Sequence, residues 1–271
     1  MLSSEVETDL QKNANRFKGF SDDYESARPV LPSYPTEIII RYLGRRPETV
    51  VDLGCGTGLS TMIWANYSRQ VIGVEPSQDM LAVALRKHNE QISFVQGSGQ
   101  HTGLENQCAD VVICSQSFHW MEPTETLKEV NRILKPGGLF ATIDYDWPPV
   151  SLWPADEAFE ELSARIKTIE STVPEIQAAF VRYPKEEHLA NIRNSRFFRY
   201  ARELLFANRE YSGSERFFNL ALSLGSLRMI LKKQPDLIAS DLQHYKEIVE
   251  DTFAGRTFPV DFCYRMRLAV K

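Results

Sequence analysis

Short apolar runs alternate with amphipathic stretches between residues 47 and 144 of the chain. The apolar runs are rich in β-branched residues and end at glycine or polar residues, which is typical of buried strands. In the stretches between them, apolar residues recur every three or four positions, as on one face of a helix. The pattern predicts strands at Thr49–Leu53, Gln70–Val74, Ile92–Gln96, Ala109–Cys114 and Leu139–Asp144, and helices at Leu59–Tyr67, Gln78–His88 and Thr124–Leu134.

This alternation of strands and helices indicates the architecture. Short links between the elements favour βαβ units, and therefore an α/β fold with a doubly wound, mainly parallel sheet. Such sheets bind ligands at the carboxyl ends of their strands, near the point where the strand order reverses. We therefore expect a functional site in the loops that follow the predicted strands.

The pattern changes after Asp146, where prolines follow Trp147 and Trp153. We predict a core at residues 1–146, with a lid segment at its amino end. Residues 147–271 are expected to add a helical cap and the last sheet strands to the same domain. Helical segments are predicted at 155–171, 174–181, 185–195, 213–231 and 236–253, one long strand or a strand pair at Phe197–Tyr211, and a final edge or antiparallel strand at Phe258–Val270.

Composition excludes several classes of protein. The 271 residues carry 31 Lys+Arg against 36 Asp+Glu, a net charge of −5, so we expect no nucleic-acid partner. No apolar run approaches the roughly 20 residues that a membrane helix needs. The amino end shows no secretory signal, and the four cysteines lack zinc spacing, which favours a cytoplasmic protein without a metal site. We expect a monomer or homodimer that acts on a small molecule.

Charge is distributed unevenly along the chain. Residues 1–150 hold 13 basic and 19 acidic side chains, and residues 151–271 hold 18 basic and 17 acidic ones. Arg193 and Arg196 belong to an arginine-rich stretch between residues 182 and 216. Their spacing of three could place them on one face of a helix over the site, where they would bind an anionic substrate. The alternative for most of these arginines is that they lie on a helix face exposed to solvent and bind no substrate.

A glycine loop carries the strongest chemical signal. The first strand runs into Gly54-Cys55-Gly56-Thr57-Gly58, and a predicted helix follows. Glycines allow a tight turn and let a ligand approach the backbone amides. Asp52, at the end of the strand, is placed to accept hydrogen bonds from the loop amides or from a ligand ammonium group. We expect Asp52 and this loop to bind a cofactor.

The second predicted strand ends at Glu75-Pro76. A carboxylate at the tip of the strand beside a glycine loop is suited to hold both hydroxyl groups of a ribose. A dinucleotide site normally shows G-x-G-x-x-G. In this chain the third glycine comes one residue early, and an acid precedes the first glycine by two positions.

With these features the stretch 47–144 resembles class I S-adenosylmethionine-dependent methyltransferases. Leu134-Lys135-Pro136-Gly137-Gly138 also matches a structural turn of that family. The resemblance implies a Rossmann-like sheet of seven strands and S-adenosylmethionine as the cofactor. It also implies that Ser98, Gly99 and Gln100 contact the adenine, although Ser98 stands where the family usually has aspartate. The resemblance implies that Met80 packs on the adenine. The alternative is that Met80 belongs to the apolar core between a helix and the sheet.

The residues after the fourth strand, Ser115-Gln116-Ser117-Phe118-His119-Trp120, are similar to the branch that contains trans-aconitate methyltransferase. The resemblance implies that Ser115 and Gln116 bind the cofactor. It places Tyr24 and Arg28 on an amino-terminal lid, where Arg28 would pair with a carboxylate of the cofactor. His119 is a candidate general base, or else it orients the cofactor or caps the turn. Trp120 lines the substrate site or belongs to the core.

The sequence therefore predicts an enzyme that transfers a methyl group from S-adenosylmethionine to a small-molecule acceptor. An oxygen, including that of a carboxylate, is the expected acceptor atom, with nitrogen and carbon as alternatives. Two other functions stay open. The chain could bind the cofactor without turnover, or it could be a nicotinamide-dependent oxidoreductase.

Overall fold

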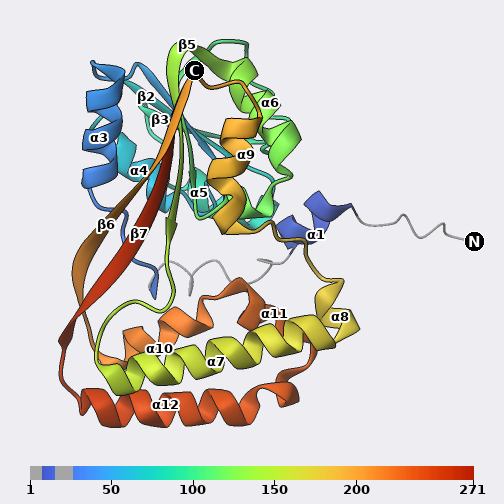
Figure 1. The fold of residues 1–271 in the computed structure, drawn as a ribbon, viewed down its shortest axis with the longest axis vertical. Coiled ribbons are helices and arrows are strands. Elements are labelled where there is room, and N and C mark those ends of the chain that lie inside the picture. Colours follow the sequence, from blue (N-terminus) through green and yellow to red (C-terminus); the bar gives the residue numbers. More distant parts are fainter. Residues whose placement is uncertain (1–7, 16–26) are drawn as a thin grey trace, which may run out of the picture. The chain divides into compact units, whose positions relative to one another are not determined.

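The computed structural model describes residues 8–15 and 27–271. Its seven-stranded sheet has the order β3-β2-β1-β4-β5-β7-β6 (Figure 1). The pairs among β1 to β5 are parallel, and β7 is antiparallel to β5. The prediction of a doubly wound, mainly parallel sheet is confirmed. The strands are β1 Thr49–Leu53, β2 Gln70–Glu75, β3 Ile92–Gln96, β4 Ala109–Ser115, β5 Leu134–Tyr145, β6 Tyr200–Ser212 and β7 Phe258–Val270.

Helices connect the strands and make up much of the second half of the chain. None of the helices within the described residues is both long and apolar enough to cross a membrane. Short 3-10 helices lie at η1 Phe118–Trp120, η2 Lys185–Glu187 and η3 Pro235–Leu237. The α-helices are α1 Asp9–Asn15, α3 Tyr34–Leu43, α4 Leu59–Trp64, α5 Gln78–Leu85, α6 Pro123–Ile133, α7 Trp153–Thr172, α8 Pro174–Gln177, α9 His188–Asn194, α10 Ser214–Leu222, α11 Gly225–Lys233 and α12 Ala239–Phe253.

The chain divides into two compact units. The sheet unit comprises residues 30–145, 182–206 and 264–271, and the helical unit comprises 146–181, 207–263 and the described part of 1–29. Two of the five boundaries between the units therefore fall inside β6 and β7. The chain returns to the sheet unit twice after residue 146, and the division into a core and a cap at that residue stays a prediction.

The strand order of the sheet unit reverses at β1. From β1 the chain proceeds outward to β2 and β3, and it then returns to β4 on the other side of β1. Figure 1 shows α3 and α4 on one side of the sheet and α6 and α9 on the other. Because both faces are covered, Val50, Val51 and Leu53 of β1 are fully buried. The carboxyl ends of β1 and β4 flank the position where such sheets bind ligands.

The helical unit has an aromatic core of its own. The ring of Phe159 on α7 lies 6.2 Å from that of Phe217 on α10 and 5.8 Å from that of Tyr245 on α12, measured between centroids. Both contacts are edge-to-face, a favourable arrangement of aromatic rings. Residues 158, 159, 162, 166 and 169 of α7 are buried, a spacing that places them on one face of the helix.

Several elements differ from their prediction. β7 is antiparallel as expected but lies between β5 and β6, so the single long strand β6 forms the edge of the sheet. Leu134-Lys135-Pro136-Gly137-Gly138 was expected to be a turn, yet it forms the irregular start of β5, where the pairing with β4 shifts register. The predicted helix at 213–231 is two helices, because α10 ends where the Ser223 hydroxyl donates to Leu220 O. The helix predicted at 185–195 is η2 followed by α9.

Asp110 joins the amino ends of β1 and β4. Its carboxylate is buried and accepts hydrogen bonds from Arg45 Nη2 (2.7 Å), Lys135 Nζ (3.1 Å), and the backbone N–H groups of Glu48 (2.7 Å) and Thr49 (2.9 Å). Burial alone would raise the pKa of Asp110, but these donors outweigh it and lower the pKa to about 2. The ionised carboxylate therefore stabilises the fold.

We expect Asp110→Asn to destabilise the protein at pH 7 by on the order of 2 kcal/mol. Since the pKa in the folded state lies below the ordinary 3.8, the contribution is complete above about pH 4 and is lost as the pH falls through about 2. Urea unfolding of both proteins at pH 7, 5 and 3 measures this difference in free energy. A difference that does not shrink at pH 3 would contradict the assigned role.

Candidate active site

The glycine loop connects β1 to α4 at the carboxyl edge of the sheet. The N–H groups of Gly54 and Cys55 donate to Val74 O at 2.8 and 3.2 Å, which fastens the loop to β2. Gly54, Gly56 and Gly58 have φ angles of 65°, 59° and 88°. These left-handed conformations strain any residue with a Cβ atom, so the spacing of the glycines follows from the shape of the turn.

The three glycines differ in what surrounds them. A Cβ atom at Gly54 would lie 2.7 Å from Cβ of Ser117, and one at Gly58 would lie 2.9 Å from Cζ of Phe94. A Cβ atom at Gly56 would meet no atom within 4 Å among the described residues. Gly54 and Gly58 thus allow close packing, whereas Gly56 presents its backbone to open space, where a ligand can reach it. This open face fits a cofactor that binds against the loop.

Glu75 holds the loop from the end of β2. Its Oε2 atom accepts a hydrogen bond from Gly56 N (2.9 Å), and its Oε1 atom accepts one from Ser77 N (2.8 Å). The carboxylate is buried, and Pro76 beside it is partly buried. Glu75 therefore positions the loop, while its expected bonds to a ribose stay a prediction.

Asp52 is fully buried at the end of β1. Its Oδ2 atom accepts from the hydroxyl groups of Ser60 and Thr61 on α4, both at 2.7 Å. Of its two expected partners, the loop amides are ruled out, because the hydroxyl groups of α4 donate to this oxygen instead, and a ligand ammonium group stays a prediction. Its Oδ1 atom has no hydrogen-bond partner among the described residues. Burial raises the pKa of Asp52 to about 6 although both hydroxyl groups oppose the shift.

The residues expected around an adenine surround the ends of β2 and β3. Met80 on α5 is buried, as are Ser98 and Gly99. Ser98 Oγ accepts from His101 N at 3.1 Å and so shapes the loop. Gln100 Oε1 is buried without a hydrogen-bond partner among the described residues, which leaves an acceptor for a ligand donor. Cys55 is also buried, and burial raises the pKa of its thiol well above the ordinary value.

Met121 is a neighbour of the loop that the sequence analysis missed. A Cβ atom at Gly99 would lie 2.5 Å from Sδ of Met121, and one at Gly54 would lie 2.8 Å from its Cε atom. Met121 therefore packs between two of the predicted cofactor segments. Nothing in the local pattern distinguished it from a core methionine, since its role depends on the fold.

The segment after β4 lies beside the glycine loop. The Ser117 hydroxyl donates to Leu53 O at 2.6 Å, and Gln116 N donates to Ile143 O at 2.9 Å. Gln116 has a φ angle of 55°, and Ser115 is partly buried. The two contacts bring the residues from Ser115 to His119 to the ends of β1 and β5, and binding of the cofactor by Ser115 and Gln116 stays a prediction.

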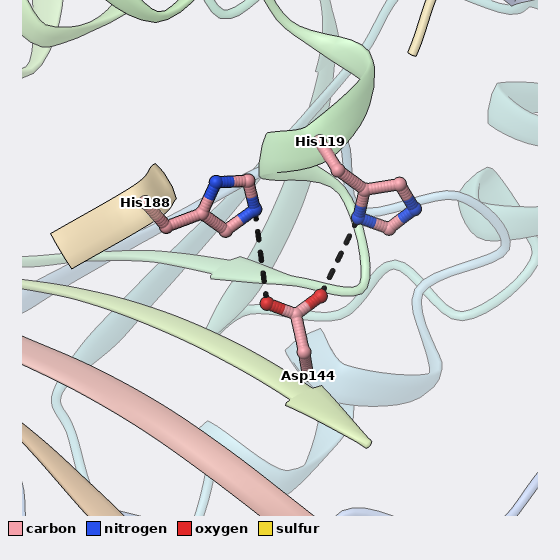
Figure 2. Close-up of side chains that lie close together, drawn as sticks. All are labelled: His119, Asp144 and His188. Carbon is pink, nitrogen blue, oxygen red and sulfur yellow. Dashed lines mark ion pairs between the residues drawn. The ribbon is translucent and has the colours of Figure 1, made fainter. Parts of the chain in front are cut away.

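His119 belongs to a buried cluster that forms around Asp144, the penultimate residue of β5. His119 Nδ1 lies 3.4 Å from Asp144 Oδ1, and His188 Nε2 lies 3.9 Å from Asp144 Oδ2 (Figure 2). Two permanent cations also contact the carboxylate: Lys185 Nζ at 3.2 Å from Oδ1 and Arg267 Nη1 at 3.0 Å from Oδ2. We call these five residues the Asp144 cluster. An acidic residue at the end of a predicted strand could have pointed to Asp144 as a site residue. Lys185, His188 and Arg267 lie far from it in the sequence, so no local pattern pointed to them.

The charges of the Asp144 cluster follow from its burial. Burial alone would raise the pKa of Asp144, but the charge of Lys185 and the contact with His119 hold it well below the usual range. Burial lowers the pKa of His188 to about 4, so this imidazole is neutral at pH 7. Asp144 is therefore ionised across the neutral range.

His119, Asp144 and His188 offer ligand atoms within 4.8 Å of one another, a set that could hold a metal ion. Each oxygen of Asp144 is already paired with a cation, Lys185 on one and Arg267 on the other. A divalent ion would be repelled by both of these charges. The geometry therefore favours a network of ion pairs, and the expected absence of a metal stays a prediction.

Three further residues were predicted to belong to the site: Tyr24, Arg28 and Trp120. Tyr24 is outside the described residues. In the helical unit Arg28 donates to Ser223 O at 2.7 Å and lies over the ring of Trp147, so its part in cofactor binding stays a prediction. Trp120 is partly buried, with its ring 4.8 Å from that of His119 between centroids.

Arg193 and Arg196 do not share a helix face, and that expectation is wrong. α9 ends at Asn194, and Arg196 follows it with a φ angle of 61°. Arg193 is exposed and donates to Ala201 O. Further arginines of the stretch 182–216 form exposed pairs, such as Arg209 with Asp261. A role of Arg193 and Arg196 in substrate binding stays a prediction.

Comparison with known proteins identifies the sheet unit. Residues 51–142 match the methyltransferase domain family. The chain contains a class I S-adenosylmethionine-dependent methyltransferase domain. It is 37% identical over 130 residues to an uncharacterised methyltransferase-like protein of Schizosaccharomyces pombe, covering 47% of this chain and 50% of that protein. It is 34% identical over 138 residues to the probable S-adenosylmethionine-dependent methyltransferase CRG1 of Saccharomyces cerevisiae, covering 46% and 47%.

Solved structures agree with the fold of the methyltransferase domain. A proposed type II methyltransferase from Anaeromyxobacter dehalogenans has a TM-score of 0.64 at 18% identity, covering 90% of this chain and 97% of that chain. The phosphoethanolamine N-methyltransferase 2 of Haemonchus contortus, solved with S-adenosylhomocysteine, has a TM-score of 0.57 at 16% identity, covering 97% and 60%. At these identities the likeness concerns the fold alone.

The chain spans about half the length of the curated relatives it matches. S-adenosylmethionine is the cofactor of this methyltransferase domain, and the open backbone at Gly56 fits it. The similarity to the trans-aconitate methyltransferase branch stays a prediction.

Proposed function

We propose that this protein transfers the methyl group of S-adenosylmethionine to an oxygen atom of a small-molecule acceptor. When bound, the cofactor supplies a methyl group on a positively charged sulfur. The observation that carries the proposal is the open backbone at Gly56, held in place by Glu75 at the ends of β1 and β2. This is where a methyltransferase domain needs a surface for its cofactor.

Different residues of the site would bind different parts of the cofactor. The loop at Gly56 would offer an open surface to the cofactor, and Glu75 would offer its carboxylate to the ribose. Met80 and the segment from Ser98 to Gln100 would surround the adenine. The unpartnered Asp52 Oδ1 and Gln100 Oε1 atoms supply acceptors for donors of the cofactor, such as ammonium and amino groups.

The acceptor would bind at the ends of β4 and β5, next to His119 and Trp120. Both side chains are at least half buried, so a small molecule would reach them more easily than a polymer would. The net charge of −5 further disfavours a nucleic acid. Oxygen acceptors include hydroxyl groups and carboxylates, and the anionic kind would use basic residues of the stretch 182–216.

Isothermal titration calorimetry tests cofactor choice. We expect one S-adenosylmethionine to bind per chain and NAD not to bind. Binding of NAD alone would favour a nicotinamide-dependent oxidoreductase and contradict the proposal.

Turnover is tested by release of S-adenosylhomocysteine with a panel of phenols, alcohols, carboxylic acids and amines. We expect at least one oxygen acceptor to be methylated. If the cofactor binds and no acceptor of the panel is methylated, a cofactor-binding protein without catalysis becomes the better interpretation.

A further inference from the structure

Gln116 carries a buried amide nitrogen that has no hydrogen-bond partner among the described residues. The oxygen of the same amide, Oε1, accepts from Lys185 Nζ at 3.1 Å. This contact fixes the orientation of the amide, because Nε2 is itself a donor and cannot replace Oε1 opposite an ammonium group. A buried donor without an acceptor costs free energy until an oxygen atom pairs with it. The amide of Gln116 is therefore suited to bind an oxygen of a ligand.

The backbone holds Gln116 in a strained conformation. Its φ angle of 55° is left-handed, which is uncommon for a residue other than glycine. Gln116 N donates to Ile143 O at 2.9 Å, and the hydroxyl group of the next residue, Ser117, donates to Leu53 O at 2.6 Å. Such conformations persist where surrounding contacts enforce them, and they are enriched at ligand sites. The two contacts thus fix the position of the side chain that faces Lys185.

Lys185 presents an unused donor beside this amide. It belongs to η2, and the chain before η2 is fastened to the segment after β4 by Tyr183 N, which donates to His119 O at 2.8 Å. Within the described part of the chain, Lys185 Nζ donates to Gln116 Oε1 and lies 3.2 Å from Asp144 Oδ1. An ammonium group has three N–H donors, so at least one remains for a further acceptor. The side chain is 29% exposed, and a ligand can therefore approach it from solvent.

The two donors select the chemistry of the ligand. A carboxylate has only acceptors, so it fits Gln116 Nε2 and Lys185 Nζ better than a hydroxyl group, which brings a donor of its own. An N–H group of a cation also binds a carboxylate more strongly than a neutral oxygen. Asp144 repels such a ligand, but Arg267 Nη1 lies 3.0 Å from its other oxygen and offsets part of its charge. We call Gln116 and Lys185 the Lys185 subsite.

The Lys185 subsite lies on the side of β1 where the acceptor would bind. Gln116 directly follows β4, and Asp144, which Lys185 contacts, is the penultimate residue of β5. The predicted cofactor residues Glu75 and Met80 belong to β2, on the other side of β1, and to α5, which follows β2. A carboxylate at the Lys185 subsite would therefore belong to the molecule that receives the methyl group.

We propose that Lys185 and Gln116 bind a carboxylate of the acceptor, which makes the substrate a small carboxylic acid. The inference rests on the proposed methyl transfer and narrows its acceptor. It assigns to Lys185 the role that sequence spacing suggested for Arg193 and Arg196. S-adenosylmethionine also carries a carboxylate, on its methionine part, so the experiment has to separate the two sources.

Calorimetry on the wild type saturated with S-adenosylhomocysteine provides the first test. Benzoate, cinnamate and glutarate are titrated, each beside the corresponding amide, which has a similar shape and no charge. These acids are ionised at pH 7. We expect at least one acid to bind and its amide to bind about 10- to 150-fold more weakly, the range for loss of a charged hydrogen bond. This comparison does not depend on the folding of a variant.

Two variants test the residues themselves. Lys185→Gln removes the charge, and Gln116→Glu keeps an acceptor for Lys185 but replaces the free donor with a second carboxylate. In both variants we expect the acid to lose its advantage over the amide, whereas Lys185→Arg should retain it. Lys135→Gln is the matched control, because Lys135 Nζ also lies 3.1 Å from a buried aspartate, Asp110, and its side chain is 35% exposed. This control should keep the preference for the acid.

A separate titration with S-adenosylmethionine alone identifies the source of the carboxylate. We expect Lys185→Gln and Gln116→Glu to bind the cofactor with the wild-type affinity. If both variants lose the cofactor and keep their preference for the acid, the Lys185 subsite holds the methionine carboxylate, and the inference is overturned.

Three further outcomes would overturn the inference. These are equal affinity of the wild type for acid and amide, no binding of any of the acids at millimolar concentration, and a preference for the acid that survives in Lys185→Gln. Failure of the wild type to bind S-adenosylmethionine would contradict the proposed function itself, and the titration with the cofactor detects it before any acid is added.

Discussion

Gly56→Leu is expected to abolish binding of S-adenosylmethionine while the domain stays folded. A Cβ atom at this position meets no atom of residues 8–15 and 27–271 within 4 Å, so the new side chain would extend into the space that the cofactor needs. The left-handed φ angle of 59° adds a cost of about 1–2 kcal/mol for a residue with a side chain, which a domain of ordinary stability tolerates. Calorimetry should show at least about a 100-fold loss of affinity, or about 2.7 kcal/mol.

Gly44→Leu is the matched control for this substitution. Gly44 caps α3 with a φ angle of 75°, and a Cβ atom there also meets nothing within 4 Å among the described residues. The backbone cost is therefore similar, but Gly44 is not part of the cofactor loop. Urea unfolding should show comparable destabilisation of both variants, and only Gly56→Leu should lose the cofactor. A wild-type affinity in Gly56→Leu would refute the assignment of the loop.

Glu75→Ala is expected to weaken binding of S-adenosylmethionine by about 1.5–3 kcal/mol, or roughly 10- to 150-fold in Kd. The substitution removes the acceptor for Gly56 N and Ser77 N, which loosens the loop, and it removes any bond to the ribose. Calorimetry with the wild type and the variant measures the loss. Glu90→Ala, at an exposed position on the same unit, is the control.

The two roles of Glu75 can be separated by changing the ligand. The wild type and Glu75→Ala are each titrated with S-adenosylhomocysteine and with its 2′,3′-dideoxy analogue. The four affinities form a thermodynamic cycle that isolates the interaction between Glu75 and the diol. If the carboxylate binds the diol, the substitution should cost much less with the dideoxy ligand. Equal losses with both ligands would mean that Glu75 only positions the loop, and equal affinity of the two proteins would exclude both roles.

The cofactor site could be predicted because its signals are local. The glycines at 54, 56 and 58 are needed by a turn of five residues, and the strand before it has a short β-branched pattern. Glu75 was found because the carboxyl ends of neighbouring parallel strands meet at one edge of a sheet. Asp52 shows the limit of this reasoning, since its partners, Ser60 and Thr61, depend on how α4 packs over β1.

The arginines show why charge patterns along a chain are weaker evidence. Arg193 and Arg196 have helical spacing, but the helix ends between them. Several arginines of the same stretch contact neighbouring carbonyl or carboxylate groups at the surface, as Arg193 and Arg209 do. Long exposed side chains find such partners easily, so their sequence spacing carries little information about a site.

The sequence by itself determined the class of fold, the cofactor loop and the position of Glu75, because each depends on residues that are close in the chain or on the register of adjacent strands. Only the tertiary structure revealed the Asp144 cluster. His119, Asp144, Lys185, His188 and Arg267 come from η1, β5, η2, α9 and β7, and no local pattern links them. Burial then fixes their charges, since a buried carboxylate stays ionised only when cations from other elements surround it.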